Sequence, residues 1–169
     1  MAMVLVFAAA GLSAQDITVD EILENYFENT GGLENWKALK GVKMTAKLNQ
    51  GGMEIPLEIV QMSDGRTYTK FSLQGTEIYQ GVFDGETLWG INFQNMQAEK
   101  SDAETTANYK LNINDFPDSF IDYEEKGYTV ELLGTETIDG AETYKVKLVK
   151  EPITINGEEQ EDVTYYYFD

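Results

Sequence analysis

The acidic side chains between positions 115 and 125 form the densest group in the chain that could do chemistry. These side chains are Asp115, Asp118, Asp122, Glu124 and Glu125. Carboxylate oxygens are the ligands that calcium prefers, but the spacing does not follow the EF-hand loop pattern. We therefore interpret the group as a solvated helix face and predict no metal site.

Histidine and cysteine are both absent from the 169 residues. Their absence removes the commonest general base and rules out Ser-His-Asp and Cys-His arrangements. Gly31-Gly32 follows no predicted strand, so it does not indicate a dinucleotide-binding loop. A carboxylate pair for glycoside hydrolysis stays open among 30 acids, although no pair stands out. We predict no enzyme, no catalytic residue and no cofactor, and a hydrolase is the third hypothesis.

The charge balance restricts the partners. The chain carries 12 basic and 30 acidic residues, a net charge of −18. Such a field repels phosphate backbones and anionic membrane surfaces. We therefore expect no nucleic-acid partner.

The N-terminal stretch 1–15 is uncharged and apolar and then ends in small residues, which is typical of a secretory signal peptide. The first basic residue is Lys37, so we expect the N-terminal end of the signal to be missing. A short apolar strand or helix is the alternative. Without a cysteine to carry a lipid, the exported product is expected in the periplasm, soluble and not lipid-anchored.

A short helix is predicted after this stretch. Thr18 and Glu21 have the spacing of a capping box, and Gly31-Gly32 suits a left-handed helix end. The apolar residues between them recur at spacings of three and four and form one helical face: Val19, Ile22, Leu23, Tyr26 and Phe27.

From Val42 onward the period changes to two, which indicates strands separated by glycine turns. We expect about eight antiparallel strands, near 42–49, 53–59, 66–74, 76–83, 86–93, 128–138, 142–155 and 158–168. The interval 95–126 has few strand signals and predicts one or two helices between the fifth and sixth strands. The apolar anchors of this segment are Phe116, Phe120, Ile121 and Tyr123. The prediction is a single α+β domain over 16–169.

Apolar residues offer the remaining functional signal. Methionines recur at positions 44, 53, 62 and 96 among many aromatic residues. Methionine adapts to varied partners, which suits a cavity for flexible chains. An ordinary core beneath the helices explains the same residues, and composition alone leaves both interpretations open.

Four motifs, in this order, resemble bacterial lipoprotein-sorting proteins of the LolA-like type. The first runs from Asp20-Glu-Ile-Leu through Gly31-Gly32-Leu to Val42-Lys-Met-Thr. The others are Phe83-Asp-Gly-Glu-Thr-Leu-Trp, Lys126-Gly-Tyr-Thr-Val-Glu-Leu-Leu-Gly and Tyr166-Tyr-Phe-Asp169.

The resemblance implies a strongly twisted antiparallel half-barrel whose concave face is covered by the N-terminal helix and the inserted helical segment. It implies a carrier of lipoprotein acyl chains or other lipids, with an inner-membrane exporter and an outer-membrane receptor as possible partners. The expected cavity residues are Met44, Ala46, Leu48, Ile55, Leu57, Ile59, Trp89, Ile91 and Phe93. The expected covering residues are Val19, Ile22, Tyr26, Phe27, Phe116 and Phe120, with the first four facing Met44, Ala46 and Leu48.

Members of this family continue beyond the Tyr-Phe-Asp motif, so we expect the domain to be truncated at its C-terminus. The second hypothesis is a non-catalytic envelope sensor or interaction module on the same scaffold, with a filled core. A continuous apolar pocket favours the carrier, and a filled core favours the module.

Overall fold

The computed structural model describes residues 17–73 and 75–169, and the expected signal segment 1–15 lies outside them. The described chain is an α+β protein of antiparallel strands with few helices. The helical elements are α1 (Val19–Asn29), α2 (Leu33–Lys37), α3 (Ala103–Leu111) and the 3-10 turn η1 (Asn112–Asp115). The strands are β1 (Gly41–Gln50), β2 (Met53–Met62), β3 (Thr67–Leu73), β4 (Thr76–Phe83), β5 (Leu88–Asn92), β6 (Gln97–Lys100), β7 (Thr129–Ile138), β8 (Ala141–Val149), β9 (Ile153–Ile155), β10 (Glu158–Gln160) and β11 (Val163–Phe168).

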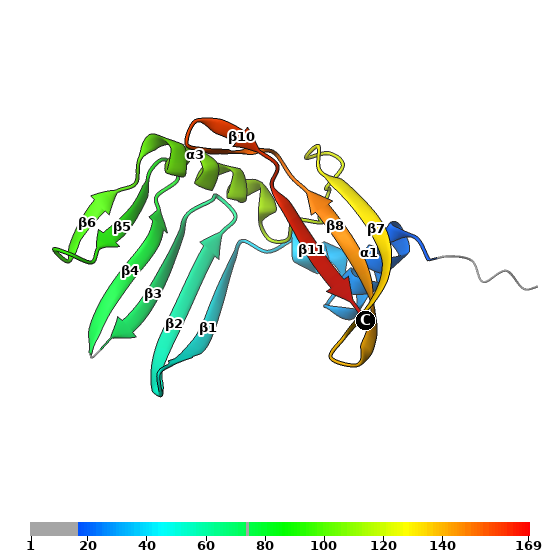
Figure 1. The fold of residues 1–169 in the computed structure, drawn as a ribbon, viewed down its shortest axis with the longest axis horizontal. Helices are drawn as coiled ribbons and strands as arrows, with labels where there is room; N and C mark the ends of the chain where they lie inside the picture. The colour runs from blue at the N-terminus through cyan, green and yellow to red at the C-terminus, as the bar shows by residue number, and fades with distance from the viewer. Residues whose placement is uncertain (1–16, 74) are drawn as a thin grey trace, which may run out of the picture.

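The strands form two main sheets. A six-stranded sheet in the sequential order β1 to β6 fills the left of Figure 1, and a three-stranded sheet in the order β11-β8-β7 fills the right. The hairpin β9–β10 lies at the top, where α3 crosses between the two sheets (Figure 1). Neighbouring strands are mostly neighbours in sequence, as expected for hairpin-connected strands.

Helix α1 begins at the predicted capping box. The Glu21 N–H donates to Thr18 Oγ1 at 3.2 Å, and the Thr18 N–H donates to the Glu21 carboxylate at 2.9 Å. These two bonds satisfy backbone donors that the first turn leaves free. After the helix, Gly31 has φ of 119°, which confirms the predicted left-handed glycine.

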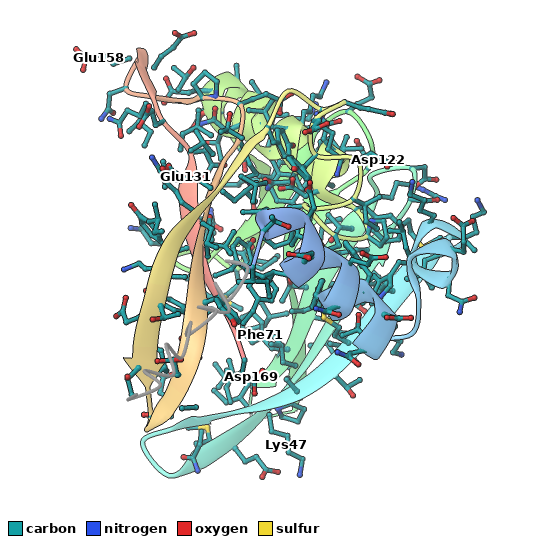
Figure 2. All side chains as sticks on the ribbon, turned by 90° about the vertical axis from the view of Figure 1, so that its right-hand side faces the viewer. Lys47, Phe71, Asp122, Glu131, Glu158 and Asp169 are labelled. Atoms are coloured by element: carbon teal, nitrogen blue, oxygen red, sulfur yellow. The ribbon has the colours of Figure 1, made fainter. Side chains whose placement is uncertain are left out.

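The main core lies between α1 and the three-stranded sheet (Figure 2). Its buried members are Ile22, Leu23, Phe27, Phe120, Ile121, Tyr128, Val146 and Leu148. The expectation that the apolar face of α1 covers β1 is therefore wrong. Val19 and Tyr26 also pack against this cluster, and the Tyr26 ring lies 5.5 Å from that of Phe168. The Phe120 ring lies 4.7 Å from the Tyr166 ring, so aromatic side chains from α1, β11 and the turn at Phe120 meet in this core.

The predicted hairpin turns are confirmed, but the strand number is larger than expected. Gly51-Gly52, Asp139-Gly140 and Asn156-Gly157 have positive φ at both positions, as two-residue hairpin turns require. The expected strand 142–155 is divided near Pro152, which has no N–H to donate. The strand Gln97–Lys100 was not predicted, because its side chains are exposed and mostly polar.

The interval 95–126 contains the predicted helical insertion, as α3 followed by η1. It also contains β6, and its last part, 116–126, with Phe116 and Phe120, lies outside the helix in turns and bends. Side chains hold helix α3 at its N-terminus and in its middle. Asp102 caps the N-terminus by accepting from the Thr105 N–H at 2.7 Å. Asn108 exchanges two hydrogen bonds with the backbone of Thr154 in β9, at 2.6 and 2.9 Å. The inserted segment thus ties the six-stranded sheet to the β9–β10 hairpin.

Candidate functional site: the apolar face of the six-stranded sheet

The register gives the six-stranded sheet one apolar and one charged face. Directly paired residues share a face, and one such row runs through Ala46, Leu57, Phe71 and Ile78. Alternate residues of each strand point the same way. The apolar face therefore consists of Val42, Met44, Ala46, Leu48, Met53, Ile55, Leu57, Ile59, Phe71, Leu73 and Ile78.

The β1–β2 end of the apolar face is open. Met44, Leu48 and Met53 expose 43%, 51% and 46% of their surface, and Ala46 is exposed as well. Further into the sheet, Leu57 and Ile59 are half-buried and Ile55 is buried. An apolar sheet face is normally covered by a second layer. Because α1 packs on the other sheet, the described part of the chain leaves β1 and the start of β2 without such a layer at Met44, Leu48 and Met53.

The β4–β5 end of the same sheet is covered by α3. Phe83 pairs with Leu88, and both side chains are buried. The Tyr109 ring of α3 lies 5.3 Å from the Phe83 ring. Among the described residues, coverage of the apolar face therefore decreases from β4–β5 toward β1, although Ile55 in the β1–β2 hairpin is still buried.

The opposite face of the sheet carries ion pairs. The Glu58 carboxylate pairs with Lys43 Nζ at 2.7 Å and accepts a hydrogen bond from the Tyr68 hydroxyl at 2.9 Å. Lys70 Nζ lies 3.6 Å from the same carboxylate. The hydrogen bond from Lys43, followed by that from Tyr68, lowers the pKa of the Glu58 carboxyl. The bond to Glu58 raises the pKa of Tyr68 in turn. We call this side the charged face.

An open trough of about 650 Å³ crosses the sheet over β1 to β4. Most of the side chains around it belong to the charged face: Thr45, Lys47, Pro56, Glu58, Lys70, Ser72 and Glu77. In Figure 2, Lys47 lies at the outer edge of the molecule and Phe71 projects between the two sheets. The trough is therefore not the cavity expected from the sequence.

The structure does not bring all nine expected cavity residues together. Met44, Ala46, Leu48, Ile55, Leu57 and Ile59 share the apolar face. Trp89 pairs with Lys100, and the Lys100 Nζ lies 5.0 Å from the centre of the Trp89 ring. Ile91, two residues further along β5, points to the same side of the sheet as Trp89. Gln80 pairs with Thr69, so its side chain lies on the apolar face. A Cβ added to Gly90 would lie 2.6 Å from the Gln80 Oε1.

Gly90 therefore faces the apolar side, and its neighbours Trp89 and Ile91 face the charged side. Phe93 follows the end of β5 and is 57% exposed.

The expected cavity set left out five members of the apolar face: Val42, Met53, Phe71, Leu73 and Ile78. Tyr68 and Phe71 of β3 are both aromatic but point to opposite faces, Tyr68 to the charged one. The sequence of β3 alone therefore does not indicate which of its residues lie on the apolar face. The expected covering residues are also separated. Phe120 is in the main core, 4.7 Å from the Tyr166 ring, and Phe116 lines a hollow beside Gln61 and Ile113.

The acidic residues 115–125 are not a helix face, since this part has turns after η1. Asp115 pairs with Lys150 at 2.9 Å, and Asp118 accepts from the Tyr26 hydroxyl at 2.9 Å. Asp122 pairs with Lys37 at 2.7 Å. These three carboxylates connect segments distant in sequence. Within 17–73 and 75–169, no group of three or more acidic side chains is placed to hold a metal ion.

No helix in the described part of the chain is long and apolar enough to cross a membrane. Comparisons with protein-family models, with curated proteins and with solved structures gave no match.

Proposed function

We propose that this protein is a periplasmic carrier that shields lipoprotein acyl chains, or other lipids, against the apolar face of its six-stranded sheet. The observation that carries the proposal is the open end of the apolar face: within residues 17–73 and 75–169, Met44, Leu48 and Met53 remain about half exposed. Large exposed apolar surfaces mark binding sites for proteins or ligands. A structural core would have buried these side chains.

The chemistry of the face suits a flexible chain. Met44 and Met53 have unbranched, polarizable side chains that can follow a moving ligand. Burying an acyl chain contributes roughly 0.8 kcal/mol per methylene, so a palmitoyl chain gives on the order of 10 kcal/mol before association costs. Such a gain is enough for binding that can still be reversed by a competing receptor.

The resemblance to LolA-like proteins supports the same proposal. In it, the six-stranded and three-stranded sheets are two parts of one half-barrel wall, with α1 and α3 on its concave side. An inner-membrane exporter delivers the cargo and an outer-membrane receptor accepts it. The charged face, with its lysine–glutamate pairs, remains toward water.

A pair of adjacent substitutions tests the proposal. Leu48→Glu places a charge on the apolar face, and Asn49→Glu places the same charge on the next residue, which points to the other side. Binding is measured with a fluorescent fatty acid whose emission rises in an apolar environment. We expect Leu48→Glu to weaken binding by about tenfold or more, equivalent to about 1.4 kcal/mol, and Asn49→Glu to have little effect.

Equal weakening by the two variants would contradict the proposal, since it would reflect net charge and not contact. A wild-type protein that leaves the probe in water would also contradict it and would favour the interaction module. Both variants are at exposed positions, and circular dichroism verifies that each is folded.

A further inference from the structure

A second apolar hollow, separate from the apolar face, lies beside α1. This groove has a volume of about 670 Å³ and lies between α1, the start of α2 and the turn 120–125. Its floor is apolar and consists of Leu23, Phe27, Leu33, Phe120, Ile121 and Tyr123. Its rim is acidic and consists of Asp20, Glu24, Glu28, Asp122, Glu124 and Glu125.

The acids of α1 stand in one row along the groove. Asp20, Glu24 and Glu28 are four residues apart, so their side chains lie above one another on the helix. Like charges at this spacing repel each other and weaken the helix. Glu28 also lies in the last turn, which holds no basic residue, and a negative charge there opposes the helix dipole.

The fold leaves most of this charge without compensation. Lys37 neutralises Asp122, and the Tyr123 hydroxyl donates to Asp20 at 3.3 Å. In the part of the chain that the structure describes, no ion pair or side-chain hydrogen bond involves Glu24, Glu28, Glu124 or Glu125. The arrangement therefore weakens the isolated protein and complements a cation from outside.

We propose that this groove docks a basic amphipathic segment of a partner protein, in which lysine or arginine residues flank one or two large apolar side chains. The apolar side chain enters the groove between Leu23, Phe27 and Leu33, of which Leu33 is 38% exposed. The flanking cations meet the glutamates of the rim.

Charge decides against other occupants. A second copy of this chain would bring a net charge of −18 against the acidic rim. An anionic lipid headgroup would be repelled in the same way. The proposal does not rest on the carrier function, because the groove and the apolar face of β1–β2 have no lining residue in common.

The test uses a fluorescein-labelled synthetic helical peptide with leucines on one face and lysines on the other. Its affinity is measured by fluorescence anisotropy for the full chain and three variants. Glu24→Lys/Glu28→Lys reverses two rim charges. Glu158→Lys/Glu159→Lys makes the same charge change on β10, on the opposite side from Asp122 in Figure 2. Leu33→Ser shortens the apolar floor without changing charge.

We expect the rim variant to weaken binding by about tenfold or more and the β10 variant by less than about twofold. Leu33→Ser is expected to weaken binding by about threefold or more. Equal losses for the two charge-reversed pairs, or no loss for Leu33→Ser, would overturn the proposal in favour of diffuse attraction. If the rim variant does not fold, Glu124→Lys/Glu125→Lys in the exposed turn replaces it. Leu48→Glu should leave peptide binding unchanged, which separates this test from that of the carrier.

Discussion

The side chain of Gln80 takes over part of the pairing between β4 and β5. Its Oε1 accepts from the Ile91 N–H at 2.6 Å, and its Nε2 donates to the Ile91 carbonyl at 3.4 Å. Direct pairing of the two strands is limited to Val82 with Trp89 and Phe83 with Leu88. The amide fits because Gly90 has no side chain at the position that Gln80 occupies.

Substituting either residue of this contact should destabilise the sheet. Gln80→Leu keeps the volume but leaves the N–H and carbonyl of Ile91 without their partner, at a cost of about 1–3 kcal/mol in the free energy of unfolding. Gly90→Ala displaces the same amide, since the new Cβ would lie 2.6 Å from Oε1. Urea unfolding of both variants and of the double variant measures the coupling. Because both changes break one contact, the double variant should lose less than the sum, and strict additivity would show that the contact is not shared.

Two identical substitutions distinguish the core from the open face. Leu148 of β8 is fully buried in the main core, whereas Leu48 of β1 is 51% exposed on the apolar face. We expect Leu148→Ala to lower the free energy of unfolding by about 2–5 kcal/mol and Leu48→Ala by less than about 0.5 kcal/mol. Chemical denaturation measures both. A large loss for Leu48→Ala would mean that β1 is covered in solution, contrary to the open face.

The helix start gives a third prediction. Thr18→Ala removes the hydroxyl that accepts from the Glu21 N–H, and we expect a loss of about 1 kcal/mol in unfolding free energy. Thr18→Ser keeps the oxygen and serves as the control. Since α1 carries much of the main core, thermal unfolding should report the change cooperatively, and equal stability of the alanine and serine variants would show that the cap is unimportant.

Alkaline unfolding tests the contact between Tyr26 and Asp118. Partial burial, followed by the charge and the hydrogen bond of Asp118, raises the pKa of Tyr26 to about 12. A pKa raised by folding means that the protonated tyrosine stabilises the native state fully below its ordinary value of about 10. This contribution is lost as the pH rises from about 10 through about 12.

Tyr26→Phe should therefore be less stable than the wild type at neutral pH, by about 1 kcal/mol, and the difference should narrow above pH of about 10. Denaturant midpoints across this range provide the measurement, with Tyr165→Phe at an exposed position as the control. A constant difference at all pH values would contradict the linkage.

Local signals in the sequence were sufficient for the helix cap, the glycine turns and the alternation within each strand. Each depends on a few neighbouring residues: Thr18 with Glu21, or the glycine pair 51–52 at one hairpin. The polar strand β6 and the turns after η1 escaped prediction, because exposed polar residues carry no periodic signal.

The sequence alone determined that the chain has an amphipathic helix, alternating strands and no residue types for histidine or cysteine chemistry. Which surfaces meet was decided by the tertiary structure. Strand β4 has one extra residue near Gly81, which shifts its pairing with β3 between Thr67 and Thr69. Side chains of the sheet after this point therefore lie on the opposite face from the one that strict alternation predicts. Trp89 and Ile91 thereby leave the apolar face. The apolar stripe of α1 shows that one face must be buried but not against which partner. In the structure this face packs with Val146, Leu148 and the aromatic side chains of β11, and Met44 and Leu48 of β1 remain exposed.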